Sequence, residues 1–184
     1  MYIMNGKREI ERRWLMNIND FNEVENWNRN IKLIGYVETI YFNGKVKEFD
    51  KNKHNELRFR KIYYFDTKKK SYKITYKQGK GLNRQEEEFD GDPRLFDLLS
   101  NKYKVMNFNY YKDDSVGKEF IYKVISLKPK KFFVLIENEF DSEEEAADFK
   151  LPEYLKKYNI KEVTEDDHFN NYKLYKRYKD KMFS

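Results

Sequence analysis

The sequence contains no cysteine and only two histidines among its 184 residues. The lack of cysteine excludes disulfide bonds, thiolate nucleophiles and the Cys-based sites that hold zinc or iron–sulfur clusters. With so few histidines, a His-rich metal centre is disfavoured as well. Any metal ion would therefore be bound by oxygen atoms, which favours hard cations such as Mg²⁺, Mn²⁺ or Ca²⁺.

Long apolar runs are also missing. No stretch approaches the roughly 20 apolar residues that span a bilayer, and the amino terminus lacks the apolar core of a signal peptide. We therefore expect a cytoplasmic protein that does not enter the membrane. Only seven glycines and three prolines are present, without a low-complexity tract, so no linker or repeat array is indicated. A single domain over residues 1–184 is expected.

Charged and aromatic side chains are abundant instead. Charged residues make up 38% of the chain and aromatic residues 18%, and the aromatic residues can build a core that so charged a chain would otherwise lack. The net charge of +6 predicts a surface or cleft that attracts anions. Nucleic acid is the default partner for such a balance. The acidic residues are interspersed with the basic ones, however, and no RRM, KH or zinc-finger signature is present, so a localised anion site is favoured.

Alternating apolar and polar residues dominate the sequence, in short runs that are typical of antiparallel strands. The pattern predicts strands near residues 8–17, 32–42, 56–65, 71–78, 84–90, 101–110, 119–127 and 131–140. Eight strands favour a closed or nearly closed barrel, because closure removes exposed edges. The expected fold class is α+β, an eight-stranded antiparallel β-barrel with a few flanking helices. Segment 78–81, Gln-Gly-Lys-Gly, lacks the P-loop pattern and joins two strands, so a hairpin turn is expected there.

Helical signals are fewer. Asp92 and Pro93 precede a periodic apolar segment, which predicts an N-capped amphipathic helix with proline in its first turn. Asp141 or Ser142 precedes three glutamates and predicts a second helix, whose acids lie near its positive end. A third helix is expected around residues 21–31.

Charged residues share one face of several predicted strands. Residues i, i+2 and i+4 of a strand point the same way, so Glu9, Glu11 and Arg13 form one line, with Ile10 and Trp14 opposite. The same arithmetic gives charged faces on further strands at Arg58, Arg60, Lys73, Lys77, Arg84, Glu86, Glu88, Lys102, Lys104, Glu137 and Glu139. The simplest interpretation is a solvated outer face around an aromatic core. Acid pairs and base pairs are segregated by strand, however, and like charges at i and i+2 need a counter-ion.

This segregation by sign predicts one site for a metal–polyphosphate complex. Carboxylate pairs brought together would repel unless a divalent cation neutralised them. Lysines and arginines around the same cavity would bind phosphate oxygens, arginine through its bidentate fork and lysine as a point charge. A wide barrel is required, because a tightly packed interior could not solvate so many charges.

The ordered motifs resemble those of the CYTH, or triphosphate tunnel metalloenzyme, family. Segment 9–15, Glu-Ile-Glu-Arg-Arg-Trp-Leu, is similar to the family's amino-terminal Glu-x-Glu-x-Lys signature. Further similarities follow in the family's order at Gly35-Tyr36, Arg58, Arg60, residues 74–77, Gly79, Gly81-Leu82, Arg84, Glu86, Glu88, Lys102, Lys104, residues 137–140, residues 142–146, residues 162–164, Phe169, Asn171 and Leu174. The resemblance extends from about residue 8 to 175.

Three departures from the family pattern are visible. Arg13 stands where the family usually has lysine, and Lys104 stands where it usually has arginine. Charge is kept, but the geometry of phosphate contacts differs between the two side chains. The family's aspartate in its Val-Asp-Val-Phe strand has no counterpart around Lys123 and Val124.

The resemblance implies an eight-stranded tunnel open at both ends that uses Mg²⁺ or Mn²⁺ to process triphosphates. The implied metal ligands are Glu9, Glu11, Glu137 and Glu139. Catalytic roles fall to Glu9 and Glu11, with Glu86 or Glu88 available to a second metal or to the attacking water. The implied phosphate-binding residues are Arg58, Arg60, Lys77, Arg84, Lys102 and Lys104, with Arg13 and Lys73 as additional candidates.

The expected activity is metal-dependent hydrolysis of the terminal phosphate of a triphosphate. Inorganic tripolyphosphate is the leading substrate, because the Glu-x-Glu and Thr-x-Lys pattern resembles that of short bacterial tripolyphosphatases; thiamine triphosphate and nucleoside triphosphates stay open. One alternative is a class IV adenylate cyclase that converts ATP to cyclic AMP and pyrophosphate. Another is a non-catalytic module that binds a nucleotide or polyphosphate. The expected partner is a small triphosphate compound, and both a monomer and a homodimer stay open.

Overall fold

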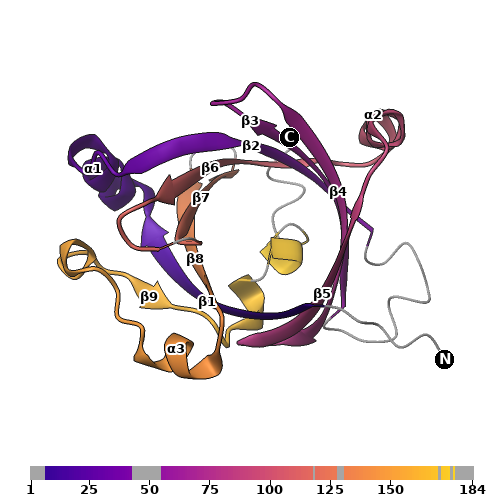
Figure 1. Ribbon diagram of the computed structural model, residues 1–184. Coiled ribbons are helices and arrows are strands. Elements are labelled where there is room, and N and C mark those ends of the chain that lie inside the picture. The colour runs from indigo at the N-terminus through magenta and orange to yellow at the C-terminus, as the bar shows by residue number, and fades with distance from the viewer. Residues whose placement is uncertain are drawn as a thin grey trace.

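In the computed structural model, eight antiparallel strands close into a barrel (Figure 1). The structure describes residues 7–42, 55–117, 119–127, 131–169, 171–174 and 176. The barrel strands are β1 (Lys7–Asn17), β2 (Ile31–Tyr41), β3 (Glu56–Tyr64), β4 (Lys70–Lys80), β5 (Asn83–Asp90), β6 (Met106–Asp113), β7 (Ile121–Leu127) and β8 (Lys131–Phe140). Their order is β5-β4-β3-β2-β6-β7-β8-β1, and pairing of β1 with β5 closes the ring. The predicted barrel is confirmed; the short strand β9 (Lys161–Glu162) adds to β1.

Three α-helices lie around the outside of the ring among the described residues (Figure 1). They are α1 (Ile18–Trp27), α2 (Pro93–Lys102) and α3 (Glu143–Asp148), and 3₁₀ turns follow at η1 (Glu153–Leu155) and η2 (Asp167–Phe169). The side chains of Asn17, Asp92 and Ser142 accept backbone N–H groups at the three helix starts. Two of these starts match the sequence prediction, whereas α1 begins before the expected residues 21–31 because Asn17 ends β1 and caps the helix at once. No helix in the described ranges is long and apolar enough to cross a bilayer.

One predicted strand begins later than expected. The alternation over residues 101–110 predicted a strand, but α2 continues to Lys102 and β6 begins only at Met106. The backbone N–H of Tyr103 still donates to the Leu99 carbonyl at 2.8 Å, which extends the helical hydrogen bonding through this segment. Lys102 therefore ends a helix and Lys104 lies in the connection to β6, with both side chains exposed.

Apolar contacts on the outside of the barrel determine which side chains face inward. One cluster joins β1 and β8 to α1 and α3 through Ile10, Trp14, Met16, Phe21, Val24, Val134, Ile136 and Ala146. A second joins α2 to the barrel, where Phe96 packs edge-on against Phe59 with ring centroids 5.1 Å apart. Because side chains alternate along a strand, burial of one set outside turns Glu9 and Glu11 inward.

A third apolar cluster fills one half of the barrel interior. It combines wall residues and C-terminal residues, namely Val37, Tyr41, Met106, Phe108, Ile125, Leu135, Val163 and Leu174, with Phe169 and Tyr172 packed against them. In Figure 1 this C-terminal segment, coloured yellow, lies within the outline of the ring. The tunnel that the resemblance implied is therefore occupied at one end by the chain's own C-terminal segment.

The connection between β4 and β5 is the expected hairpin turn. Gly79 and Gly81 have φ values of 119° and 66°, in the region that favours glycine. The Glu165 carboxylate packs directly against Gly81, where a Cβ would collide with it. The same carboxylate accepts the Leu82 N–H at 3.2 Å, so the turn is tied to the segment that leads into the barrel.

Phe21 should contribute strongly to the attachment of α1. Its ring is 1% exposed, with centroids 5.0 Å from Tyr111 and 5.2 Å from Tyr122. We expect Phe21→Ala to lower the free energy of unfolding by about 3–5 kcal/mol, because the truncation leaves a cavity. Phe89→Ala is the matched control, since Phe89 is 57% exposed, and should change stability by about 0.5 kcal/mol or less. Urea unfolding followed by circular dichroism measures both; equal losses would contradict the assignment.

Candidate functional site

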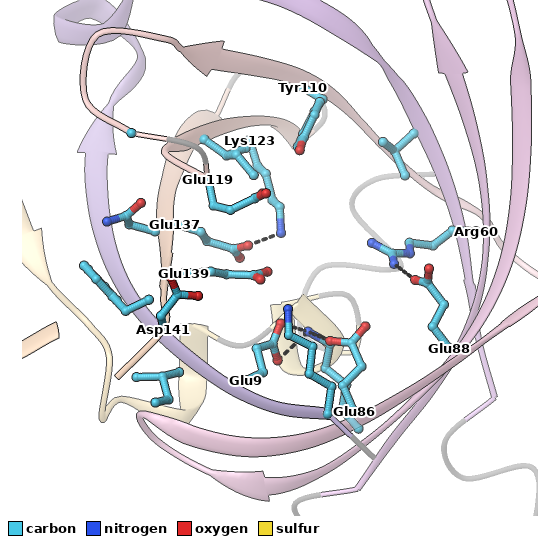
Figure 2. A pocket seen from close by; sticks show the side chains of 18 of the residues that line it. Glu9, Arg60, Glu86, Glu88, Tyr110, Glu119, Lys123, Glu137, Glu139 and Asp141 are labelled. Atoms are coloured by element: carbon cyan, nitrogen blue, oxygen red, sulfur yellow. Dashed lines mark hydrogen bonds and ion pairs between the residues drawn. The ribbon is translucent and has the colours of Figure 1, made fainter. Parts of the chain in front are cut away.

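A cavity of about 720 Å³ occupies the charged half of the barrel interior (Figure 2). All eight barrel strands contribute to its wall, which combines acidic, basic and aromatic side chains. The lining includes Glu9, Val37, Arg58, Arg60, Tyr64, Lys77, Glu86, Glu88, Phe108, Tyr110, Lys123, Glu137 and Glu139. A cavity of this size suits a small-molecule ligand.

Four glutamates come together on the neighbouring strands β1 and β8. Glu11 pairs directly with Glu139 in the register of the two strands, and Glu9 and Glu137 lie two residues away on the same faces. Glu9, Glu11 and Glu137 are buried, whereas the Glu139 side chain is exposed within the lumen. In Figure 2 the carboxylates of Glu9, Glu137 and Glu139 point into the channel. The predicted grouping of these acids is therefore observed.

Cations from β4 and β5 neutralise the two glutamates of β1. The Lys77 ammonium donates to both carboxylate oxygens of Glu9, at 2.5 and 2.7 Å, and lies 2.8 Å from Glu86. The Arg84 guanidinium lies 3.3 Å from the Glu9 carboxylate and also contacts Glu11. These contacts form a continuous chain of alternating charge from Glu86 to Glu11, which reduces the cost of burying each member.

Glu11 and Glu139 have raised pKa values. Burial and the neighbouring Glu137 carboxylate raise the pKa of Glu11 to about 8. Burial and the neighbouring Glu9 carboxylate raise the pKa of Glu139 to about 7. Burial has this effect although solvent reaches the Glu139 side chain, because protein surrounds the barrel lumen into which it points. Burial and the neighbouring like charges therefore favour the protonated forms of these two carboxylates.

Glu9 and Glu137 behave in the opposite way. Burial disfavours the charged form of both, but adjacent lysines outweigh it. Lys77 and Arg84 hold the pKa of Glu9 well below its usual value. Lys123, which donates to the Glu137 carboxylate, lowers the pKa of Glu137 to about 2. The cluster thus combines two carboxylates with lowered pKa values and two with raised pKa values.

The facing wall on β3, β4 and β5 carries the guanidinium groups. Arg58 lies 3.0 Å from Glu56, and Arg60 lies 2.6 Å from Glu88 and 3.3 Å from the Thr75 hydroxyl. The Nε atoms of Arg58 and Arg60 are buried and have no hydrogen-bond partner. Both side chains also line the cavity, so this wall offers positive charge to an anion.

The remaining predicted phosphate ligands are spread over four environments. Arg84 belongs to the central chain of ion pairs, while Lys73 lies farther along β4, 2.9 Å from Asp90 and 3.5 Å from Glu88. Arg13 donates instead to the Thr164 carbonyl at 2.7 Å and to the Phe169 carbonyl at 3.3 Å, so it anchors the C-terminal segment. Lys102 and Lys104 do not line the cavity, because both precede β6.

Several residues that line the cavity were not predicted from the sequence. Lys123 of β7 is the most prominent, since it contacts Glu137 in the acidic wall. Tyr110 and Glu119 also face the channel (Figure 2). The alternation of Ile121, Lys123 and Ile125 with Tyr122 is consistent with an inward-facing Lys123. The site was predicted from pairs of like charges at i and i+2, however, and Lys123 is a single charge in an apolar strand.

The carboxylate cluster fits a hard divalent cation by its donor chemistry, since its glutamates offer only oxygen atoms. Burial and neighbouring carboxylates raise the pKa values of Glu11 and Glu139 despite the resident cations, so a further cation would stabilise their ionised forms. Within the described ranges, no three acidic or imidazole side chains are already placed to chelate a metal together. Metal binding would therefore require a carboxylate to exchange a proton or an ion pair for the metal.

Solved structures of low sequence identity share the barrel. The hypothetical protein NE1496 superposes with a TM-score of 0.52 at 23% identity, over 90% of this chain and 96% of that chain. The PH1819 protein from Pyrococcus horikoshii OT3 gives 0.51 at 20% identity, over 76% of this chain and 82% of that chain. A putative adenylate cyclase from Vibrio parahaemolyticus superposes with a TM-score of 0.52 at 11% identity, over 76% of this chain and 81% of that chain.

These similarities confirm the fold expected from the CYTH-like motifs. NE1496 is also known from a second crystal structure as an inorganic triphosphatase. No protein-family model and no curated protein matches the sequence. At such identities the similarity concerns the fold, so activity has to be argued from the site.

The raised pKa of Glu11 predicts that the metal-free protein loses stability as pH rises. Its folded-state pKa of about 8 exceeds the ordinary value of 4.5, so between these values the folded state binds more protons than the unfolded state, and the free energy of unfolding falls with increasing pH. We expect a lower melting temperature at pH 8.5 than at pH 6 in EDTA. Glu11→Gln should reduce this difference, whereas Glu38→Gln, on the outer face beside Lys61, should preserve it. A wild-type protein that is more stable at pH 8.5 would contradict the burial of Glu11.

Proposed function

We propose that this chain is a CYTH-type, metal-dependent triphosphatase that hydrolyses the terminal phosphate of inorganic tripolyphosphate or a related triphosphate. The observation that carries the proposal is the interior cavity, where Glu9, Glu137 and Glu139 line one wall, next to the buried Glu11, and arginine and lysine side chains line another. Such an arrangement matches a ligand that carries both signs of charge, as a metal–triphosphate complex does. The fold shared with NE1496, which is described as an inorganic triphosphatase, supports the assignment.

Arg58 and Arg60 would bind the phosphate oxygens. Their guanidinium groups already pair with Glu56 and Glu88, and both side chains line the cavity. Planar guanidinium groups bind phosphate in a bidentate manner. Lys77, held between Glu9 and Glu86, would supply a point charge at the boundary between the basic and acidic walls.

Glu9, Glu11, Glu137 and Glu139 would hold Mg²⁺ or Mn²⁺. Such an ion, when bound, neutralises phosphoryl oxygens and makes the attacking water more acidic. Glu86 or Glu88 would orient this water, since both line the same cavity. The chain's own contribution is then positioning and electrostatic stabilisation, as is general for phosphoryl transfer, and no covalent nucleophile is needed.

A second candidate function is cyclisation of a nucleoside triphosphate. The cavity wall includes the aromatic and aliphatic residues Ile62, Tyr64, Phe108 and Tyr110, which suit an organic group attached to the phosphates. The putative adenylate cyclase with the same barrel is consistent with this alternative. In that reaction the ribose hydroxyl attacks the α-phosphorus of ATP and pyrophosphate leaves.

Product analysis separates these functions. Purified protein would be incubated with tripolyphosphate, ATP or thiamine triphosphate, each with Mg²⁺ or Mn²⁺, and the products identified by ion chromatography. Orthophosphate and pyrophosphate from tripolyphosphate are the expected result. Cyclic AMP with pyrophosphate would establish the cyclase instead. Tight binding without turnover of any substrate would contradict catalysis and indicate a binding module.

Loss of one clustered carboxylate should abolish turnover. We expect Glu9→Gln and Glu137→Gln each to lower kcat/KM for tripolyphosphate by about 100-fold or more, since even the outer partners of metal ligands are worth about 10- to 100-fold. Glu38→Gln removes an equivalent charge from the outer face, where Glu38 pairs with Lys61 at 2.5 Å, and should keep full activity. Circular dichroism checks that each variant is folded. Full activity of a folded Glu137→Gln protein would refute the metal assignment.

Arg60 should act mainly in substrate binding. We expect Arg60→Ala to raise the KM for tripolyphosphate by about tenfold, the effect of losing about 1.4 kcal/mol of binding energy. Arg94→Ala is the matched control, because Arg94 is exposed on α2 and pairs with Asp92. Steady-state kinetics over a range of substrate concentrations measures both variants. An unchanged KM in Arg60→Ala would exclude a phosphate contact.

A further inference from the structure

Lys123 is a buried lysine of the cavity wall that has no part in the proposed phosphate or metal contacts. It lies on β7, its side chain is 8% exposed, and it lines the cavity. In Figure 2 its ammonium projects toward the Glu137 carboxylate. A charge in this position is costly unless it is paired, so its presence inside the barrel requires an explanation.

Two contacts stabilise the Lys123 ammonium. It donates a hydrogen bond to Glu137 Oε2, and it lies 5.8 Å from the centroid of the Phe108 ring. Glu137 is itself buried and belongs to the carboxylate cluster. The aromatic face adds a smaller cation–π attraction. Lys123 is therefore held in one place, with its charge directed at a carboxylate of the candidate metal site.

The position of Lys123 separates it from the other interior cations. Arg58 and Arg60 belong to β3, and Lys77 to β4, on the basic wall. Lys123 instead lies beside β8, where the register places it opposite Leu135, two residues before Glu137. It thus brings a positive charge to the acidic wall, where a divalent cation would bind.

We propose that Lys123 is a built-in cation of the triphosphate site, which competes with a divalent metal for Glu137 and contributes its ammonium to binding of the phosphate chain. The inference rests on the proposed function, because it takes the cavity to be the triphosphate site. A bound metal and Lys123 both need the same carboxylate, so each weakens the other's hold on it. A phosphate oxygen can accept from the same ammonium, which carries three donors.

Removal of the charge should then have opposite effects on the two ligands. Lys123→Gln frees Glu137 and lowers the positive charge near the metal site, so Mn²⁺ should bind more tightly. The same change removes a donor and a charge from the phosphate site, so tripolyphosphate without metal should bind more weakly. A merely structural role for Lys123 would weaken both ligands together or leave both unchanged.

Isothermal titration calorimetry measures the two affinities separately. Mn²⁺ alone is titrated into metal-free protein, and tripolyphosphate alone is titrated in the presence of EDTA. For Lys123→Gln we expect the Kd of Mn²⁺ to fall and the Kd of tripolyphosphate to rise, each by about tenfold, the size of one charge-assisted hydrogen bond. Changes in the same direction for both ligands, or no change in either, would overturn the proposal.

Two further variants separate charge from folding. Lys123→Arg keeps the positive charge and should bind tripolyphosphate within about threefold of the wild type, a difference below 1 kcal/mol. Lys61→Gln removes a lysine of the outer face that pairs with Glu38, and should change neither affinity. Thermal melting of all variants in EDTA identifies any that are unfolded. If Lys123→Gln is unfolded, a Lys123→Arg protein that binds both ligands like the wild type supports the role of charge, and loss of tripolyphosphate binding in folded Lys123→Arg contradicts it.

The wild-type titrations distinguish failure of this inference from failure of the proposed function. If the wild-type protein binds neither Mn²⁺ nor tripolyphosphate, the cavity is not a triphosphate site and both proposals fall. If the wild type binds both and Lys123→Gln matches it, the triphosphate site stands and only the role of Lys123 is refuted.

Discussion

Acidic and basic side chains are buried together inside one barrel. The barrel can form only because these charges neutralise one another. Lys77 contacts two glutamates and Arg84 contacts two, so the charges form a connected chain. Breaking one member leaves a neighbour buried without a partner, which is costly. A ligand that carries both cation and anion can replace these pairs one for one, whereas an uncharged ligand cannot. The contacts that neutralise the buried charges would thus also suit the interior to the proposed metal–anion complex.

The packing outside the barrel and the C-terminal segment inside it determine where this charge can lie. Burial of the outer faces of β1 and β8 against α1 and α3 leaves their polar faces to the lumen. The C-terminal segment fills the apolar half of that lumen, and Arg13 anchors it through two backbone carbonyls. The cavity is consequently a pocket with a packed end, so a phosphate chain and any attached group would have to share the charged half.

The sequence allowed much of the fold to be predicted, because alternation is a local property. The strand faces with Glu9, Glu11, Arg58 and Arg60 follow from period two alone, and the structure places these residues inside the barrel. The pairing of Glu11 with Glu139 is a matter of register between distant strands, which spacing along one strand does not contain. For this reason the proximity of the four acids could be predicted only from two features, the segregation of acidic and basic pairs by strand and the family resemblance.

The errors have equally local causes. Lys102 and Lys104 alternate with Tyr103 as in a strand, yet the Asp92 cap and Pro93 begin a helix whose hydrogen bonding extends over that segment. Arg13 continues the inward line of β1, but it lies beyond the cavity, where the C-terminal carbonyls meet it. Sequence spacing gives the direction of a side chain and not its depth along the barrel axis.

The pairing of β1 with β8 brings together carboxylates that are far apart in the sequence. These two strands are the first and the last of the ring, and all four clustered carboxylates come from them. More than a hundred residues separate the glutamates of β1 from Glu137 and Glu139 of β8 in the sequence. Contacts between residues so far apart in the chain form slowly. The carboxylate cluster is therefore complete only after the last barrel strand has paired with the first.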